Sequence, residues 1–163
     1  TNAGSTAQGS NDNIFIGYDA GGGTWTDTAS TQNVAIGNYS MDAALAAATA
    51  NTALGYNTLT ALTTGDYNTA FGLNALDAAT VPQRVTAIGT AAMRGAVTAD
   101  AIGTVAIGYA ALNVLTSGER NLAIGYEALD ALTVGDDNIA IGYQALTNLG
   151  TSTFANRNIA IGT

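Results

Sequence analysis

The chain has 163 residues, of which 47% are hydrophobic and 20 are glycine, and its net charge is −8. It contains four arginines and no lysine, histidine or cysteine. This composition excludes the clustered cations that bind nucleic-acid phosphates, and it excludes disulfides and thiolate metal sites. We expect no membrane insertion, because no apolar run approaches the roughly 20 residues of a spanning helix.

A short phrase related to Asn-x-Ala-Ile-Gly recurs along the chain at spacings of 17 to 20 residues. The nine copies begin at Asn13, Asn33, Asn51, Asn68, Val85, Thr104, Asn121, Asn138 and Asn158. Such a period is typical of a solenoid. We therefore predict one repeat array over residues 1–163, with a partial rung at 1–12, eight full rungs at 13–157 and a partial rung at 158–163.

The middle of each phrase predicts a three-residue strand. Its second and fourth positions carry mostly large or β-branched residues, and its third is Ala in eight copies and Phe15 in the first. Alternation in a strand sends the second and fourth side chains to one face and the third to the other. We expect the bulky face to fill the core, and another coil wall or another chain to approach the Ala face closely.

The fifth position is glycine in every copy, which indicates a positive φ or a backbone with no room for a Cβ. These glycines are Gly17, Gly37, Gly55, Gly72, Gly89, Gly108, Gly125, Gly142 and Gly162.

The second half of each repeat has a different spacing. Ala128, Leu129 and Leu132 fall at i, i+1 and i+4, and Gly135 follows where a helix C-terminus favours glycine. We predict a short helix or 3₁₀ turn here, with a second bent strand as the alternative.

These elements predict an all-β-type repeat solenoid, a parallel β-roll or β-helix with short helical or 3₁₀ turns. One rung cannot bury its own apolar face, so neighbouring rungs must stack. At about 4.8 Å per rung, nine rungs would form a rod roughly 40 Å long.

Two polar columns follow from this stacking. The first-position asparagines suggest either a ladder of stacked amides or a polar binding strip; they are Asn13, Asn33, Asn51, Asn68, Asn121, Asn138 and Asn158. In the preceding column, Arg120, Asp137 and Arg157 should lie one above another, with Tyr67 beneath Arg84.

Aromatic residues offer candidate contacts with a ligand or partner. Tyr18, Tyr56, Tyr109, Tyr126 and Tyr143 each follow a fifth-position glycine. They either stack along the solenoid or form a stripe that binds glycans. Trp25 stands alone in an irregular early loop, where it contacts a partner or plugs the first rung.

Catalytic and metal chemistry find little support. There is no His, Cys or Lys to act as base or nucleophile, so we expect no enzyme and no cofactor. The Gly-rich stretch before Trp25 is not followed by the Lys of a phosphate loop. Asp136, Asp137 and Asn138, and separately Asp66, invite a calcium interpretation, but the known calcium repeat patterns are absent.

The phrases NVAIG, NTALG and NTAFG resemble the head repeats of YadA-type trimeric autotransporter adhesins. The longer form, seen in NLAIGYEALDALTVG, is similar to repeats in bacteriophage tail fibres and related bacterial surface proteins. The resemblance covers residue 13 to the end of the chain. It implies a parallel β-roll, commonly trimeric, that serves as an adhesive or structural stalk, and it implies no catalytic residue.

The partial repeats at the two ends of the sequence suggest a way for copies of the chain to join. Residues 1–12 and 158–163 together have the length of one repeat. Either Asn158, Ile159, Ala160 and Ile161 form a joint that a neighbouring chain completes, which would generate a fibre, or the sequence is a segment of a longer array.

We expect an extracellular fibre or filament subunit at a bacterial or viral surface that assembles with itself as a homo-oligomer or head-to-tail polymer. A receptor-binding or adhesive fibre domain that recognises a cell-surface glycan is the alternative.

Overall fold

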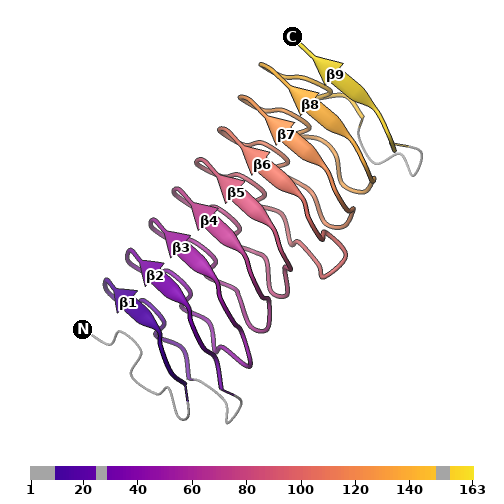
Figure 1. The fold of residues 1–163 in the computed structure, drawn as a ribbon. Helices are drawn as coiled ribbons and strands as arrows, with labels where there is room; N and C mark the ends of the chain where they lie inside the picture. Colours follow the sequence, from indigo (N-terminus) through magenta and orange to yellow (C-terminus); the bar gives the residue numbers. More distant parts are fainter. Residues whose placement is uncertain (1–9, 25–28, 150–154) are drawn as a thin grey trace.

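The computed structural model describes residues 10–24, 29–149 and 155–163. In these residues the chain forms nine three-residue strands joined in one sheet (Figure 1). The strands are β1 (Ile14–Ile16), β2 (Val34–Ile36), β3 (Thr52–Leu54), β4 (Thr69–Phe71), β5 (Thr86–Ile88), β6 (Val105–Ile107), β7 (Leu122–Ile124), β8 (Ile139–Ile141) and β9 (Ile159–Ile161). No helix of the described residues is able to span a membrane.

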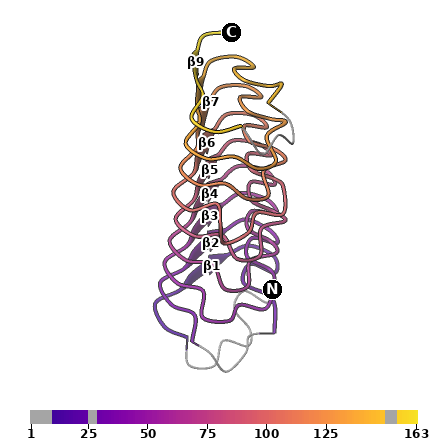
Figure 2. The same ribbon diagram turned by 90° about the vertical axis from the view of Figure 1, so that its right-hand side faces the viewer.

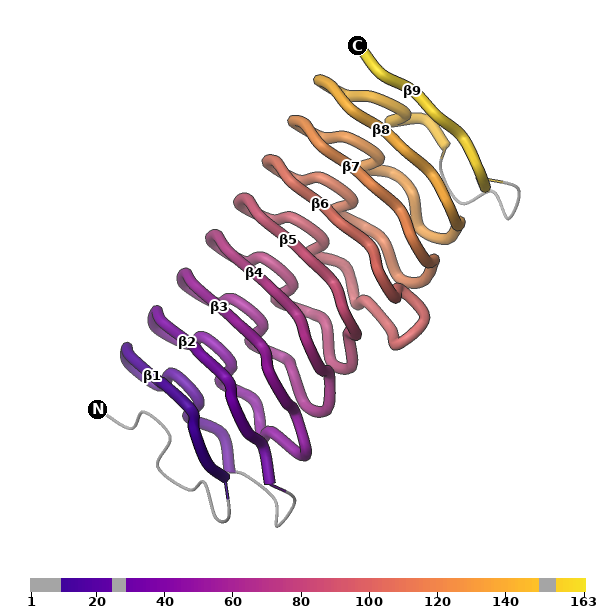
Figure 3. Tube along the Cα trace, viewed as in Figure 1, coloured from indigo at the N-terminus to yellow at the C-terminus, as the bar shows by residue number. Residues whose placement is uncertain are grey.

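The sheet is parallel and its strands follow chain order, so each rung pairs only with the rungs before and after it (Figure 3). Its register never slips, because equivalent repeat positions face each other throughout; Ala53, for example, pairs with Ala70 and Ala70 with Ala87. The strands form one wall of the coil, and turns form the rest of each rung (Figure 2). The predicted parallel solenoid is confirmed.

The orientation of the strands is the reverse of our expectation. The third-position alanines are buried, including Ala53, Ala106 and Ala123 at 0% exposure, while the second and fourth side chains point outward. Large leucines and methionines of the turns opposite, such as Leu59 and Leu112, fill the interior together with these alanines. The core is narrow, so a small side chain from one wall faces a large one from the other.

The first rung shows the same volume rule with its two partners exchanged. Phe15 occupies the strand position that is Ala in the other rungs, and Gly21 occupies the turn position that is Leu59 in the third rung. A Cβ added to Gly21 would lie 2.9 Å from the Phe15 ring. Phe15 thus fills the space that the turn leucine fills elsewhere.

The predicted short helices are wrong, because the described residues contain no helix. The i, i+1, i+4 pattern arises from two consecutive turns. In the seventh rung, Ala128 N–H donates to Gly125 O at 3.5 Å and Leu132 N–H donates to Leu129 O at 3.1 Å. Glu127, inside the first turn, and Leu129, at the start of the second, have φ of 52° and 53°, which no right-handed helix allows.

The fifth-position glycine is required for both reasons that the sequence suggested. Gly125 has a φ of 139°, and a Cβ there would lie 2.2 Å from the carbonyl oxygen of Gly142 in the next rung. Side chains rarely adopt that conformation and none would fit that space.

Substitutions in β4 test which face of the sheet is inside. Ala70→Leu should lower the free energy of unfolding by about 1–3 kcal/mol, because it overpacks the core. Phe71→Ala should cost less, because the Phe71 side chain is 50% exposed. Chemical denaturation of the dilute chain measures both. A larger loss for Phe71→Ala than for Ala70→Leu would contradict the observed orientation.

Candidate interaction surfaces

The asparagine column lies inside the coil and forms a hydrogen-bonded ladder. Asn33 Oδ1 accepts bonds from the backbone N–H and the side-chain Nδ2 of Asn51, both at 3.0 Å. Asn51 Nδ2 also donates to Gly65 O at 2.7 Å, across its own rung. The asparagines from Asn33 to Asn138 are buried. The column therefore holds the rungs in register from within and is not exposed as a binding strip.

The exceptions in this column divide the ladder into two runs. Val85 N–H donates to Asn68 Oδ1 at 3.0 Å, but the valine side chain offers nothing to the next rung. Thr104 resumes the column, because its hydroxyl donates to Gly118 O at 3.1 Å and accepts from Asn121 N–H at 3.3 Å. Asn121, Asn138 and Asn158 form the second run.

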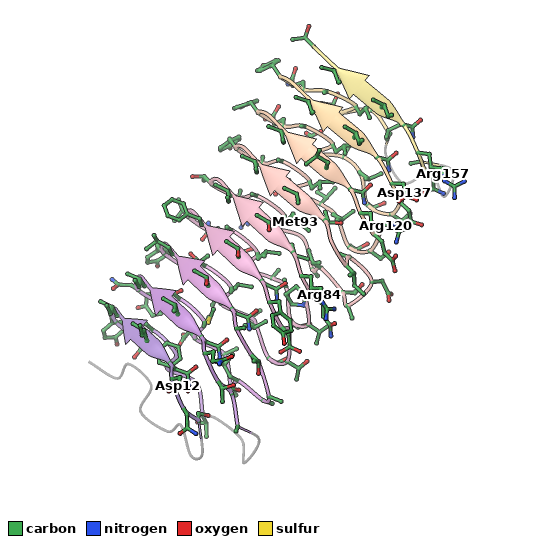
Figure 4. All side chains as sticks on the ribbon, in the orientation of Figure 1. Asp12, Arg84, Met93, Arg120, Asp137 and Arg157 are labelled. Carbon is green, nitrogen blue, oxygen red and sulfur yellow. The ribbon has the colours of Figure 1, made fainter. Side chains whose placement is uncertain are left out.

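The column before the asparagines lies just before the N-terminal ends of the strands, where Arg84, Arg120, Asp137 and Arg157 lie in a row (Figure 4). Its members have positive φ, as at Asp137 with 59°, so the tight corner of each rung falls here. Arg120 Nε donates to Asp137 Oδ1 at 2.7 Å, and Arg157 Nε lies 3.9 Å from Asp137 Oδ2. Hydrogen bonding to Arg120 lowers the pKa of Asp137.

Next to this column, an open pocket with a volume of about 450 Å³ collects three carboxylates. Asp136 and Glu119 have partners within the protein. Asp136 Oδ1 accepts from Glu119 N–H at 2.9 Å, and the Glu119 carboxylate pairs with Arg120. Asp66 likewise accepts from Thr49 N–H at 2.8 Å. In the described part of the chain, no group of three or more acidic side chains is placed to hold a metal ion.

The tyrosines form two groups instead of one stripe, because Leu73 and Thr90 interrupt the column. Tyr109, Tyr126 and Tyr143 stack with centroids 5.0 and 5.3 Å apart and planes within 15°. Stacking covers both faces of the middle ring and one face of each outer ring, so this group offers a ligand mainly ring edges.

The second group includes a tyrosine that we did not single out. Tyr39, one position further along its rung, lies between Tyr18 and Tyr56 with centroids 5.4 and 5.6 Å apart. The planes meet at 75° and 82°, so the three rings are not a stack. Counting positions from the fifth-position glycine would not have found Tyr39, because its contact with the column is diagonal.

The outer face of the sheet is the largest feature that the sequence analysis missed. The second and fourth positions of the repeated phrase, which are the first and last residues of each strand, are Ile, Val, Leu, Thr or Phe in all nine copies, with no charged residue among them. Ile16, Leu54 and Phe71 are 56%, 36% and 50% exposed. The sequence shows a column of alanines and two columns of larger residues, but alternation alone does not say which of them faces the core.

Two of the predicted sites remain. Trp25 falls outside the described residues. Asn158, Ile159, Ala160 and Ile161 form the last rung, where Ile159 and Ile161 are 69% and 75% exposed. Within the described structure β9 pairs only with β8, and β1 only with β2.

Comparison with known proteins found no matching family model, no matching curated protein and no matching solved structure. The resemblance to YadA-type heads and phage tail fibres thus stays a prediction.

Asn51→Ala should destabilise the fold by roughly 1–3 kcal/mol, because it leaves Gly65 O and Asn68 N–H buried without their partners. Thermal or chemical unfolding measures the loss. Asn158→Ala, at the half-buried end of the ladder, serves as the control and should cost less. Equal effects at the two positions would contradict the importance of burial.

Asp137→Arg should lower the melting temperature at neutral pH, because it places arginines in three consecutive rungs of one column. Asp137→Asn should lower it less. The ion pair of Arg120 and Asp137 contributes to stability at pH values above the pKa of the carboxyl in the unfolded chain. This contribution is lost as pH falls through the lowered pKa of Asp137 in the folded chain. The difference between Asp137→Asn and the unchanged chain should therefore close as pH falls below about 4, and a constant difference would contradict the ion pair.

Proposed function

We propose that this chain is a structural subunit of an extracellular fibre that associates with copies of itself. The observation that carries the proposal is the uncharged, apolar outer face that runs along all nine strands. Soluble proteins rarely expose a continuous apolar patch larger than a few hundred Å², and larger patches mark interaction sites. Among the described residues no group of acidic side chains is placed to hold a metal ion, and this outer face is the most distinctive surface of the molecule.

A second copy fits this face because both surfaces have the same repeat along the rod. Two sheets can pack face to face at about 10 Å with interdigitating side chains. The face carries no charge, so the net charge of −8 is kept on other sides of the rod during contact. A homo-oligomer, including the trimer implied by the resemblance, would cover the exposed Ile and Phe side chains.

The edges of the sheet support growth along the rod axis. An unpaired strand edge is a template for another strand. By the pattern of Ile139, whose N–H donates to Asn158 O in the following rung at 2.8 Å, the N–H of Ile159 points to where a further rung would lie. A strand from another copy placed there would continue the parallel ladder head to tail, which is the rung completion expected from the sequence.

Phe71→Asp tests lateral association. In analytical ultracentrifugation the unchanged chain should form an oligomer as its concentration rises. Phe71→Asp should raise the concentration needed for association at least tenfold, because a buried unpaired carboxylate opposes contact. Val114→Asp is the matched control, since Val114 is 40% exposed on another side of the coil.

Negative-stain imaging of the same samples separates the two modes of assembly. Rods several chains long that persist in Phe71→Asp would support head-to-tail joining. A chain that remains monomeric at high micromolar concentration would contradict self-association altogether.

The adhesive role is the second candidate, because the Tyr18 and Tyr56 side chains are 52% and 47% exposed and do not stack face to face with each other. Specific capture of a cell-surface glycan by the chain would favour this role over a purely mechanical one. The resemblance to tail fibres and adhesins supports both roles.

A further inference from the structure

The first three rungs bring aromatic and acidic side chains together at one corner of the coil. We call Tyr18, Tyr39, Tyr56, Asp19 and Asp42 the Tyr39 cluster. Tyr39 meets both neighbouring rings nearly at right angles, so the T-shaped contacts leave ring faces turned in different directions. Tyr18 and Tyr56 are about half exposed. The face of a tyrosine ring carries negative charge density and attracts cations.

Two carboxylates, those of Asp19 and Asp42, belong to the first two of these rungs. The carboxylate of Asp42 is positioned over Gly22, because a Cβ added to that glycine would lie 2.7 Å from Asp42 Oδ1. It therefore reaches back towards Asp19 in the rung before. Partial burial, and then the charge of Asp19, raise the pKa of Asp42. Asp19 and Asp42 both act on Tyr39 as well, so the five side chains share one electrostatic environment.

No basic side chain belongs to the rungs that form the Tyr39 cluster. The first basic side chain in the sequence is Arg84, in the fifth rung. Further along the rod the same kinds of groups are matched internally. The guanidinium of Arg84 lies 5.4 Å from the centre of the Tyr67 ring, and Arg94 Nε lies 3.4 Å from Asp77 Oδ2. Arginine thus matches Tyr67 and Asp77 in the later rungs, and no arginine lies in the rungs of the Tyr39 cluster.

We propose that the Tyr39 cluster binds a quaternary ammonium group, with the tyrosine ring faces contacting the methyl groups and Asp19 and Asp42 supplying the opposite charge. A quaternary ammonium suits this surface because it has no N–H to satisfy and is attracted by ring faces and carboxylates together. The Tyr109, Tyr126 and Tyr143 stack is less suited, since stacking covers both faces of its middle ring and one face of each outer ring.

The charge of the cluster also predicts which source of that group is preferred. Free choline is a simple cation. Phosphocholine, as found on lipid headgroups, carries an adjacent phosphate that Asp19 and Asp42 would repel. We therefore expect choline to bind more tightly than phosphocholine.

Calorimetric or NMR titration of the folded chain with choline chloride tests the proposal, with sodium chloride replacing choline so that ionic strength stays constant. Saturable binding is expected. Tyr39→Leu should weaken it about fivefold or more, because it removes the central ring. Asp42→Asn should weaken it too, and it provides a second readout if Tyr39→Leu folds poorly. Tyr126→Leu is the matched control in the stacked group and should bind as the unchanged chain does.

Two results would overturn the proposal. One is the absence of saturable choline binding at constant ionic strength. The other is equal affinity in Tyr39→Leu, Asp42→Asn and Tyr126→Leu. Tighter binding of phosphocholine than of choline would overturn the role given to the carboxylates. The titration is made on dilute chain, so it does not depend on fibre assembly.

Discussion

The stacking of equivalent rungs at a fixed register is the constraint on which the rest of this structure depends. Backbone bonds join neighbouring rungs all round the coil, for example from Gly108 N–H to Ile88 O and from Glu127 N–H to Tyr109 O, both at 2.8 Å. This close approach excludes a Cβ at the fifth position, as the 2.2 Å clash at Gly125 shows. The hydrogen bonds between rungs also offset the cost of the left-handed backbone conformation of Leu129 and its equivalents, which is about 1–2 kcal/mol for a residue with a side chain.

The narrow interior that results decides where each side chain goes. Buried asparagines bond from rung to rung, and alanines of the sheet face leucines of the turns. The exchange of Phe15 and Gly21 in the first rung shows that the pair of positions, not either residue alone, is matched in volume. Since the turns supply the large core residues, the Ile and Phe side chains of the strands have no place inside. An apolar outer face follows from a core that is already full.

The two halves of the rod differ in how their surface groups are matched. From Arg84 onwards, arginines lie against Tyr67, Asp77 and Asp137, and three tyrosines cover one another. In the first rungs the Tyr39 cluster has no basic residue nearby in the sequence. Under the two proposals, the outer face of the sheet serves self-association and the Tyr39 cluster in the first three rungs serves recognition of a cation. This combination keeps both the fibre and the adhesive proposals open to the same set of experiments.

Much of the fold could be read from the period, because a 17-residue repeat with a constant glycine has few solutions other than stacked coils, and stacking alone places Arg120 beside Asp137 and Tyr67 beside Arg84. The sequence could not distinguish a short helix from two consecutive turns that include residues of positive φ, since both give the spacing of Ala128, Leu129 and Leu132. Nor could it orient the strand: alternation separates Ala106 from Ile107 but does not say which is inside. Only the tertiary structure decided that, because the width of the coil depends on the opposite wall, and the leucines of that wall leave room for alanine alone.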